Sequence, residues 1–143
     1  MISDRLKDFR EDNDLYQKDI SKKIGVSQQT YSMWENGTKI IPLKHLNTLC
    51  NIYDISMDYF LGFSNKNKSV NKINILNKND IGNRIREVRK KNNLTVRDLA
   101  SYLNTTPSTI SAYENGKTLI LTAFAYQICI KYNISMDYLC CKE

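Results

Sequence analysis

The chain has 143 residues, 41% of them hydrophobic and 25% charged, and a formal net charge of +6. This length suits two small domains better than one large core, and no apolar run of about 18 residues predicts a membrane-spanning helix. The first residues lack the apolar stretch of a signal peptide, so we expect a cytoplasmic protein without a membrane partner. The positive charge permits a nucleic-acid partner but does not by itself indicate one.

The four cysteines and the single histidine form no metal-binding pattern. There is no Cys-x-x-Cys pair and no Cys/His cluster. Cys50 and Cys129 lie in apolar stretches and are expected to be reduced core thiols, whereas Cys140 and Cys141 are expected to be exposed. His45 has no second histidine or cysteine with which to form a site. With no nucleophile-base arrangement and no phosphate-binding glycine loop, we expect neither an enzyme nor a metal or other cofactor.

The chain contains an internal repeat, because a shift of 79 residues aligns its two halves without a gap. Between the pairs Arg5/Arg84 and Gly62/Cys141, 18 of the 58 aligned residues are identical. Many of the other pairs exchange one apolar residue for another. The longest shared stretches are Glu-Asn-Gly at 35–37 and 114–116, and Ile-Ser-Met-Asp-Tyr at 55–59 and 134–138. This similarity predicts two copies of one fold.

Five short helices are predicted in each copy. In the first copy, the second helix spans about residues 17–24, and Gly25 provides the left-handed conformation that a tight turn needs. The third helix begins after the capping residue Ser27 and ends before Gly37, the fourth spans about 43–53, and a short fifth helix follows Ser56. The second copy has the same order, with Asn104 at the position of Gly25 and its fourth helix at about 122–132. No convincing strand pattern occurs in either copy.

Residues 65–79 are predicted to be a polar linker between domains at 1–64 and 80–143. The linker holds four lysines and no acid, whereas the flanking domains have net charges of −1 and +3. Its only apolar side chains are Val70, Ile73, Ile75 and Leu76. These residues are predicted either to dock on one of the domains or to extend the first helix of the second.

The second and third helices of each copy, with the short turn between them, form a helix-turn-helix unit. This unit presents one face of the third helix to a DNA major groove, which is wide enough for a helix. The sequence resembles the phage repressor and Cro (XRE-like) helix-turn-helix family in QKDISKKIGVSQQTYSMWENG and VRDLASYLNTTPSTISAYENG, and in the closing ISMDYFLG and ISMDYLCC. The resemblance implies an all-α fold of two tandem five-helix, lambda-repressor-like domains whose third helix reads DNA.

The resemblance also implies an internal ion pair between the first and third helices of each domain. The residues concerned are Arg10 with Glu35, and Arg89 with Glu114. We interpret both pairs as structural, because loss of one partner would leave a partly buried charge unpaired.

The first domain offers the better candidates for reading bases. Gln28 and Gln29, at the start of the third helix, can each form two hydrogen bonds with adenine, and Met33 can pack on a thymine methyl group. Ser32 lies on the same face. Candidate phosphate contacts, which position a domain without selecting sequence, are Gln17, Asn36, Lys39 and Lys44. The acidic residues at 11, 12 and 14 are an objection: either they face away from the DNA, or the first domain binds weakly alone.

The second domain has shorter side chains at the reading positions, which favours a contribution to affinity over sequence selection. Its candidate DNA contacts are Arg97, Ser108, Thr109, Ala112, Asn115 and Lys117, and Ser111 lies among them. Its fourth helix is apolar nearly all round, which predicts a protein interface at Phe124, Tyr126 and Ile130, most simply a homodimer. The alternative is that the apolar linker residues cover this helix within one chain.

The sequence therefore predicts a sequence-specific regulator of transcription that binds double-stranded DNA, acts as a repressor and reads the operator with its first domain. The alternative is an antitoxin-like or antirepressor-like module whose second domain binds a protein partner.

Overall fold

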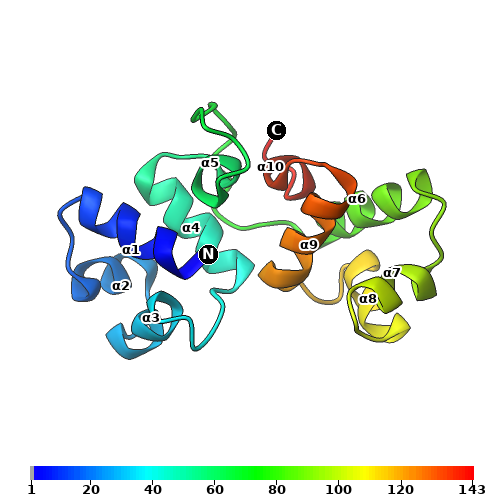
Figure 1. Ribbon diagram of the computed structural model, residues 1–143, viewed down its shortest axis with the longest axis horizontal. Coiled ribbons are helices and arrows are strands. Elements are labelled where there is room, and N and C mark those ends of the chain that lie inside the picture. The colour runs from blue at the N-terminus through cyan, green and yellow to red at the C-terminus, as the bar shows by residue number, and fades with distance from the viewer. Residues whose placement is uncertain (1) are drawn as a thin grey trace. The chain divides into compact units, whose positions relative to one another are not determined.

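The computed structural model describes residues 2–143, and these residues form ten helices and no strand. They divide between Ser69 and Val70 into two compact units of five helices each (Figure 1). The helices of the first unit are α1 (Ile2–Asp12), α2 (Gln17–Ile24), α3 (Gln28–Glu35), α4 (Leu43–Tyr53) and α5 (Met57–Leu61). Those of the second unit are α6 (Lys78–Lys91), α7 (Val96–Tyr102), α8 (Pro107–Glu114), α9 (Thr122–Tyr132) and α10 (Met136–Leu139). The predicted all-α class with five helices per domain is confirmed, and no described helix is long and apolar enough to span a bilayer.

The turn before the third helix of each unit has the geometry that its residues predict. Gly25 and Asn104 both have a positive φ, of 87° and 56°, which is the left-handed conformation that reverses the chain. The third helices then start from hydroxyl caps, since Ser27 accepts a hydrogen bond from the Thr30 N–H and Thr106 accepts one from the Thr109 N–H. The two non-identical turns thus meet the same backbone requirement.

Each unit has its own apolar core, built from equivalent positions of the repeat. In the first unit the most buried side chains include Leu6, Ile20, Tyr31, Leu49 and Phe60, all fully buried. Their equivalents in the second unit are Ile85, Leu99, Ile110, Ile128 and Leu139, none of which is more than 2% exposed. Burial of each such side chain stabilises the fold by about 1.5–3 kcal/mol, and each unit has a core of its own.

Helix α6 begins within the segment predicted to be a linker. The Asn77 side chain caps it by accepting hydrogen bonds from the N–H groups of Asn79 and Asp80. Gly82 lies where α6 meets the end of α8, and a β-carbon there would collide with the carbonyl oxygen of Tyr113. This close approach brings the α6 side chains up to the C-terminal end of α8.

Both ends of the segment between the units are held by hydrogen bonds. The Asn67 side chain accepts from the Ser56 N–H at 2.9 Å and donates to the Asp54 carbonyl at 3.0 Å, which joins it to the α4–α5 turn. In the second unit, the Asn71 N–H donates to the Lys142 carbonyl at 2.8 Å. Of the four apolar residues of the segment, Leu76 is buried and Ile75 is 84% exposed.

The cysteines are more buried than the sequence suggests. Cys50 and Cys129 are buried, as predicted, but the expectation that Cys140 is exposed is wrong, since it is 1% exposed. The repeat explains this, because Cys140 occupies the core position that Leu61 fills in the first unit. Burial raises the pKa of the Cys140 thiol well above its usual value, so this group is expected to be unreactive.

Candidate nucleic-acid interface

Helix α3 is fixed in the first unit by its inner face, which leaves the opposite face for a ligand. Tyr31 and Trp34 are buried and meet edge to face, with ring centroids 6.0 Å apart. The Trp34 ring also contacts the ring of His45 on α4, at 5.3 Å. Burial lowers the pKa of His45, so this imidazole contributes apolar packing near neutral pH rather than positive charge.

The outer face of α3 forms one side of a shallow surface hollow, the α3 hollow. Its lining residues are Gln17, Gln28, Gln29, Ser32, Met33 and Asn36. The structure thus brings together six of the eight residues that the sequence assigned to DNA contacts in this domain. Gln28 and Gln29 are exposed at the start of the helix. Lys39 and Lys44 are exposed but lie outside the lining of the hollow.

Two residues of the α3 hollow are also tied to the protein. The Gln17 side-chain amide donates to a carboxylate oxygen of Glu35 at 3.2 Å. The Asn36 side-chain oxygen accepts hydrogen bonds from the N–H and the hydroxyl of Thr38. Because these contacts fix both side chains, Gln28 and Gln29 remain the long polar side chains best placed for base contacts.

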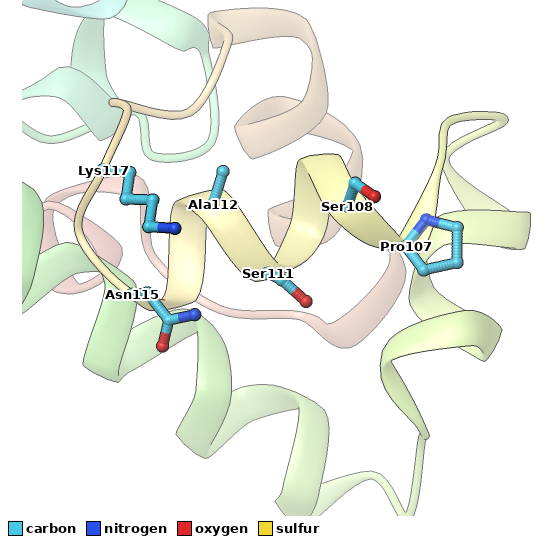
Figure 2. A pocket seen from close by; sticks show the side chains of 6 residues that line it. All are labelled: Pro107, Ser108, Ser111, Ala112, Asn115 and Lys117. Carbon is cyan, nitrogen blue, oxygen red and sulfur yellow. The ribbon is translucent and has the colours of Figure 1, made fainter.

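The second unit has a matching hollow on α8, the α8 hollow. It is lined by Pro107, Ser108, Ser111, Ala112, Asn115 and Lys117 (Figure 2). Five of these positions are equivalent to lining positions of the α3 hollow under the shift of 79 residues. Figure 2 shows Pro107 and Ser108 at one end of α8, with Asn115 and Lys117 at the other. The hollow has the same place in the fold, but Pro107, Ser108 and Ala112 are shorter than their equivalents Gln28, Gln29 and Met33.

Two residues assigned to DNA contacts in the second domain lie elsewhere. The Thr109 hydroxyl is 2.9 Å from the Thr106 hydroxyl and belongs to the cap of α8, like Thr30 in the first unit. Arg97 is exposed near the start of α7 and does not line the hollow. Pro107, which the sequence assigned only to the start of the helix, does line it.

In the first unit, a buried ion pair connects α1 to the end of α3. The Arg10 guanidinium donates to the two Glu35 carboxylate oxygens at 2.6 and 3.0 Å and to the Leu15 carbonyl at 2.8 Å. The two side chains are only 12% and 5% exposed. Burial alone would raise the pKa of Glu35, but hydrogen bonds from Arg10, Tyr31 and Gln17 outweigh it and lower the pKa.

The corresponding pair in the second unit has an additional cation. Arg89 donates to the Glu114 carboxylate at 2.7 and 3.0 Å and to the Leu94 carbonyl at 3.0 Å. Arg86 donates to the same carboxylate at 3.3 Å and to the side-chain oxygen of Asn115 at 3.0 Å. Arg86 thus takes the place of Gln17, whose equivalent, Val96, has no donor in its side chain. Two guanidinium groups share one carboxylate here.

Comparison with known protein families identifies both units. One model, described as "Helix-turn-helix", matches residues 6–60, and another, described as "Helix-turn-helix domain", matches residues 82–142. The chain is a tandem of two helix-turn-helix domains. The α2–α3 and α7–α8 pairs are their helix-turn-helix units, and the predicted family resemblance is confirmed.

Two curated proteins that are similar to the chain carry the names of transcriptional regulators. The chain is 34% identical over 64 residues to the uncharacterized HTH-type transcriptional regulator YobD of Bacillus subtilis (strain 168), a match that covers 45% of this chain and 57% of YobD. It is 30% identical over 67 residues to the cryptic phage CTXphi transcriptional repressor RstR of Vibrio cholerae, a match that covers 47% of this chain and 60% of RstR. The chain thus spans less than two thirds of the length of these relatives. No solved structure matches the chain significantly.

The fourth helix of the second helix-turn-helix domain, α9, exposes part of its apolar surface. Ile130 is 57% exposed, and Leu121, just before the helix, is 56% exposed. Phe124 and Tyr126 are half-buried, and the Phe124 ring lies 6.5 Å from the ring of Tyr113. Of the three residues predicted at a protein interface, Ile130 is therefore the most accessible.

Proposed function

We propose that the chain is a sequence-specific regulator of transcription that reads the DNA major groove with α3 of its first domain. The observation that carries the proposal is the α3 hollow, where six outward side chains gather around one face of the helix. The inner face of α3 is buried by Tyr31 and Trp34, so the domain can present the helix rigidly. Gln28 and Gln29 can then form bidentate hydrogen bonds with adenine.

The second domain is proposed to bind DNA with less sequence selection. The α8 hollow has the same position in the fold, but Ser108, Ser111 and Ala112 are too short for bidentate contacts with bases. Lys117 and the side-chain amide of Asn115 suit phosphate contacts, which contribute affinity and fix the register of a domain on the duplex.

We further propose that regulation takes the form of repression. A helix-turn-helix protein that occupies an operator can exclude other proteins from the same DNA without any contact to them. The similarity to RstR, a protein named as a transcriptional repressor, is consistent with this mode of action.

Selection of bound duplexes from a random pool by the full chain tests the proposal. We expect one motif to be enriched, with adenine at the positions that α3 reads, and we expect that motif, placed in a promoter, to reduce expression of a reporter. A pool that stays random after several rounds would contradict sequence-specific binding. Enrichment without reduced expression would contradict repression alone.

We also propose that the full chain forms a homodimer through the exposed surface of α9. Ile130 and Leu121 are large, exposed apolar side chains of the second domain. They belong to, or directly precede, a helix that is apolar nearly all round, and such a helix needs cover on its outer side. We expect Ile130→Lys to convert a dimer into a monomer in sedimentation velocity experiments. Ile40→Lys is the matched control, because Ile40 is 56% exposed and lies in the first domain. A wild-type chain that is monomeric at all concentrations would rule out the dimer.

A further inference from the structure

A strip of basic residues on α6 lies beside the α8 hollow of the second domain. Arg86 on α6 contacts the rim of the hollow, because its guanidinium donates to the side-chain oxygen of Asn115 at 3.0 Å. Asn115 is one of the residues that line the hollow (Figure 2). The face of α6 that carries Arg86 therefore borders the end of the hollow at which Asn115 and Lys117 lie.

Lys90 extends this face along the helix, whereas Lys91, five residues after Arg86, lies on another side of it. Residues four apart lie on the same side of a helix, so Lys90 follows Arg86 by one turn, and both lysines are exposed. The intervening Arg89 ties this part of α6 to the last residue of α8, because it binds the Glu114 carboxylate at 2.7 Å. The two lysines thus belong to the helix end that is fixed against the end of α8.

The first domain has the opposite charge at the equivalent positions. Lys90 and Lys91 correspond to Glu11 and Asp12, which are also exposed. Six equivalent positions on and around the ion pair are charged in both domains, but the numbers of cations and anions are reversed. The second domain has four cations and two anions, Arg86, Arg89, Lys90, Lys91, Glu87 and Glu114; the first has two cations and four anions, Lys7, Arg10, Asp8, Glu11, Asp12 and Glu35.

The fold itself does not require these lysines. Cations at a helix C-terminus are favourable because they compensate the helix dipole, and this alone would explain Lys90 and Lys91. However, α1 ends in the same place with Glu11 and Asp12 and forms the same contacts between Arg10, Glu35 and Leu15. The charge reversal therefore indicates a role outside the fold.

We propose that Arg86 and Lys90 form an accessory phosphate-binding strip, which binds the backbone of double-stranded DNA next to the α8 hollow. Arg86 leaves excess positive charge at the junction, because Glu114 can neutralise only one of the two guanidinium groups that it binds. The strip rests on the proposed DNA binding and gives the second domain a salt-dependent contribution to affinity that the first domain lacks. Such contacts release condensed counterions and carry no sequence information.

The test is the salt dependence of DNA binding by the full chain carrying Lys90→Gln. The matched control is Lys66→Gln, which removes the same charge from the exposed segment between the domains. Each lost phosphate contact reduces the slope of log K against log salt by about 0.9. We expect the α6 variant to lose about 0.9 from this slope and to bind roughly fivefold to tenfold more weakly near 0.1 M salt.

The outcomes separate the strip from the proposed function. If the α6 variant and the control change the slope equally, net charge explains the effect and the strip is wrong. If neither changes it while the wild type binds DNA, the strip is also wrong, but the proposed function stands. If the wild-type chain binds no duplex, both proposals fail. Arg86→Gln, which keeps a donor for Glu114, is expected to reduce the slope by about a further 0.9.

Discussion

Replacing Gln28 and Gln29 together by alanine is expected to weaken strongly the preference of the protein for adenine at the positions that α3 reads, while leaving its fold intact. Both side chains are exposed in the α3 hollow, and alanine is the best helix former, so α3 should persist. A bidentate glutamine–adenine contact contributes about 1–3 kcal/mol of discrimination. Each lost contact should therefore reduce the preference for its base by roughly fivefold to a hundredfold, measured by repeating the duplex selection with the variant.

The internal repeat provides the control for this experiment. Ser108→Ala with Ser111→Ala changes two positions of the α8 hollow, equivalent to Gln29 and Ser32, and is expected to leave the selected motif unchanged. If the glutamine variant enriches the same motif as the wild type, α3 is not the reader that we propose. A change of motif in the serine variant alone would assign base reading to the second domain.

Glu35→Ala is expected to destabilise the first domain by about 3–5 kcal/mol, the usual effect of removing one partner from a buried ion pair. The Arg10 side chain is only 12% exposed, so its charge is poorly solvated once the carboxylate is lost. The substitution also removes the acceptor of the Gln17 side chain. Urea unfolding monitored by the fluorescence of Trp34, the single tryptophan, reports on this domain.

Acid should reduce this difference in stability. The pKa of Glu35 is lower in the folded domain than its usual value, so the ion pair stabilises the domain fully above the unfolded-state pKa. This stabilisation is lost as the pH falls through the lowered pKa, and the wild type and the variant should then converge. Glu11→Ala removes an exposed carboxylate one residue from Arg10 and should change stability little. Equal effects of the two substitutions, or a difference that persists in acid, would contradict a structural role for the pair.

The helices and turns were predictable because their signals are local. The turns depend on single residues, Gly25 and Asn104, and so do the caps, Ser27 and Thr106. Each turn and cap occurs at equivalent positions of both copies, which supports its assignment. The start of α6 was not predictable in the same way. Its cap, Asn77, lies in a stretch rich in asparagine and lysine that is typical of a flexible linker.

The lining of the two hollows was largely predictable, but the basic strip on α6 was not. The reading positions follow directly from the turn and the helix period, which place Gln28 and Ser32 on one face. Arg86 and Lys90 belong to a helix that precedes the helix-turn-helix unit, and only its contact with Asn115 brings the strip to the hollow. The available signal was the charge reversal at aligned positions of the two copies. The net charges of whole domains do not reveal it.

The hydrogen bonds of Asn67 and Asn71 determine where the two domains can be separated. A fragment that ends at the predicted boundary, residue 64, would lose the Asn67 amide that joins the Asp54 carbonyl to the Ser56 N–H. A second-domain fragment that begins at residue 80 would lose both the bond from Asn71 to Lys142 and the Asn77 cap of α6. Cleavage at residues 68–70 breaks none of these bonds, so protease sensitivity should concentrate there.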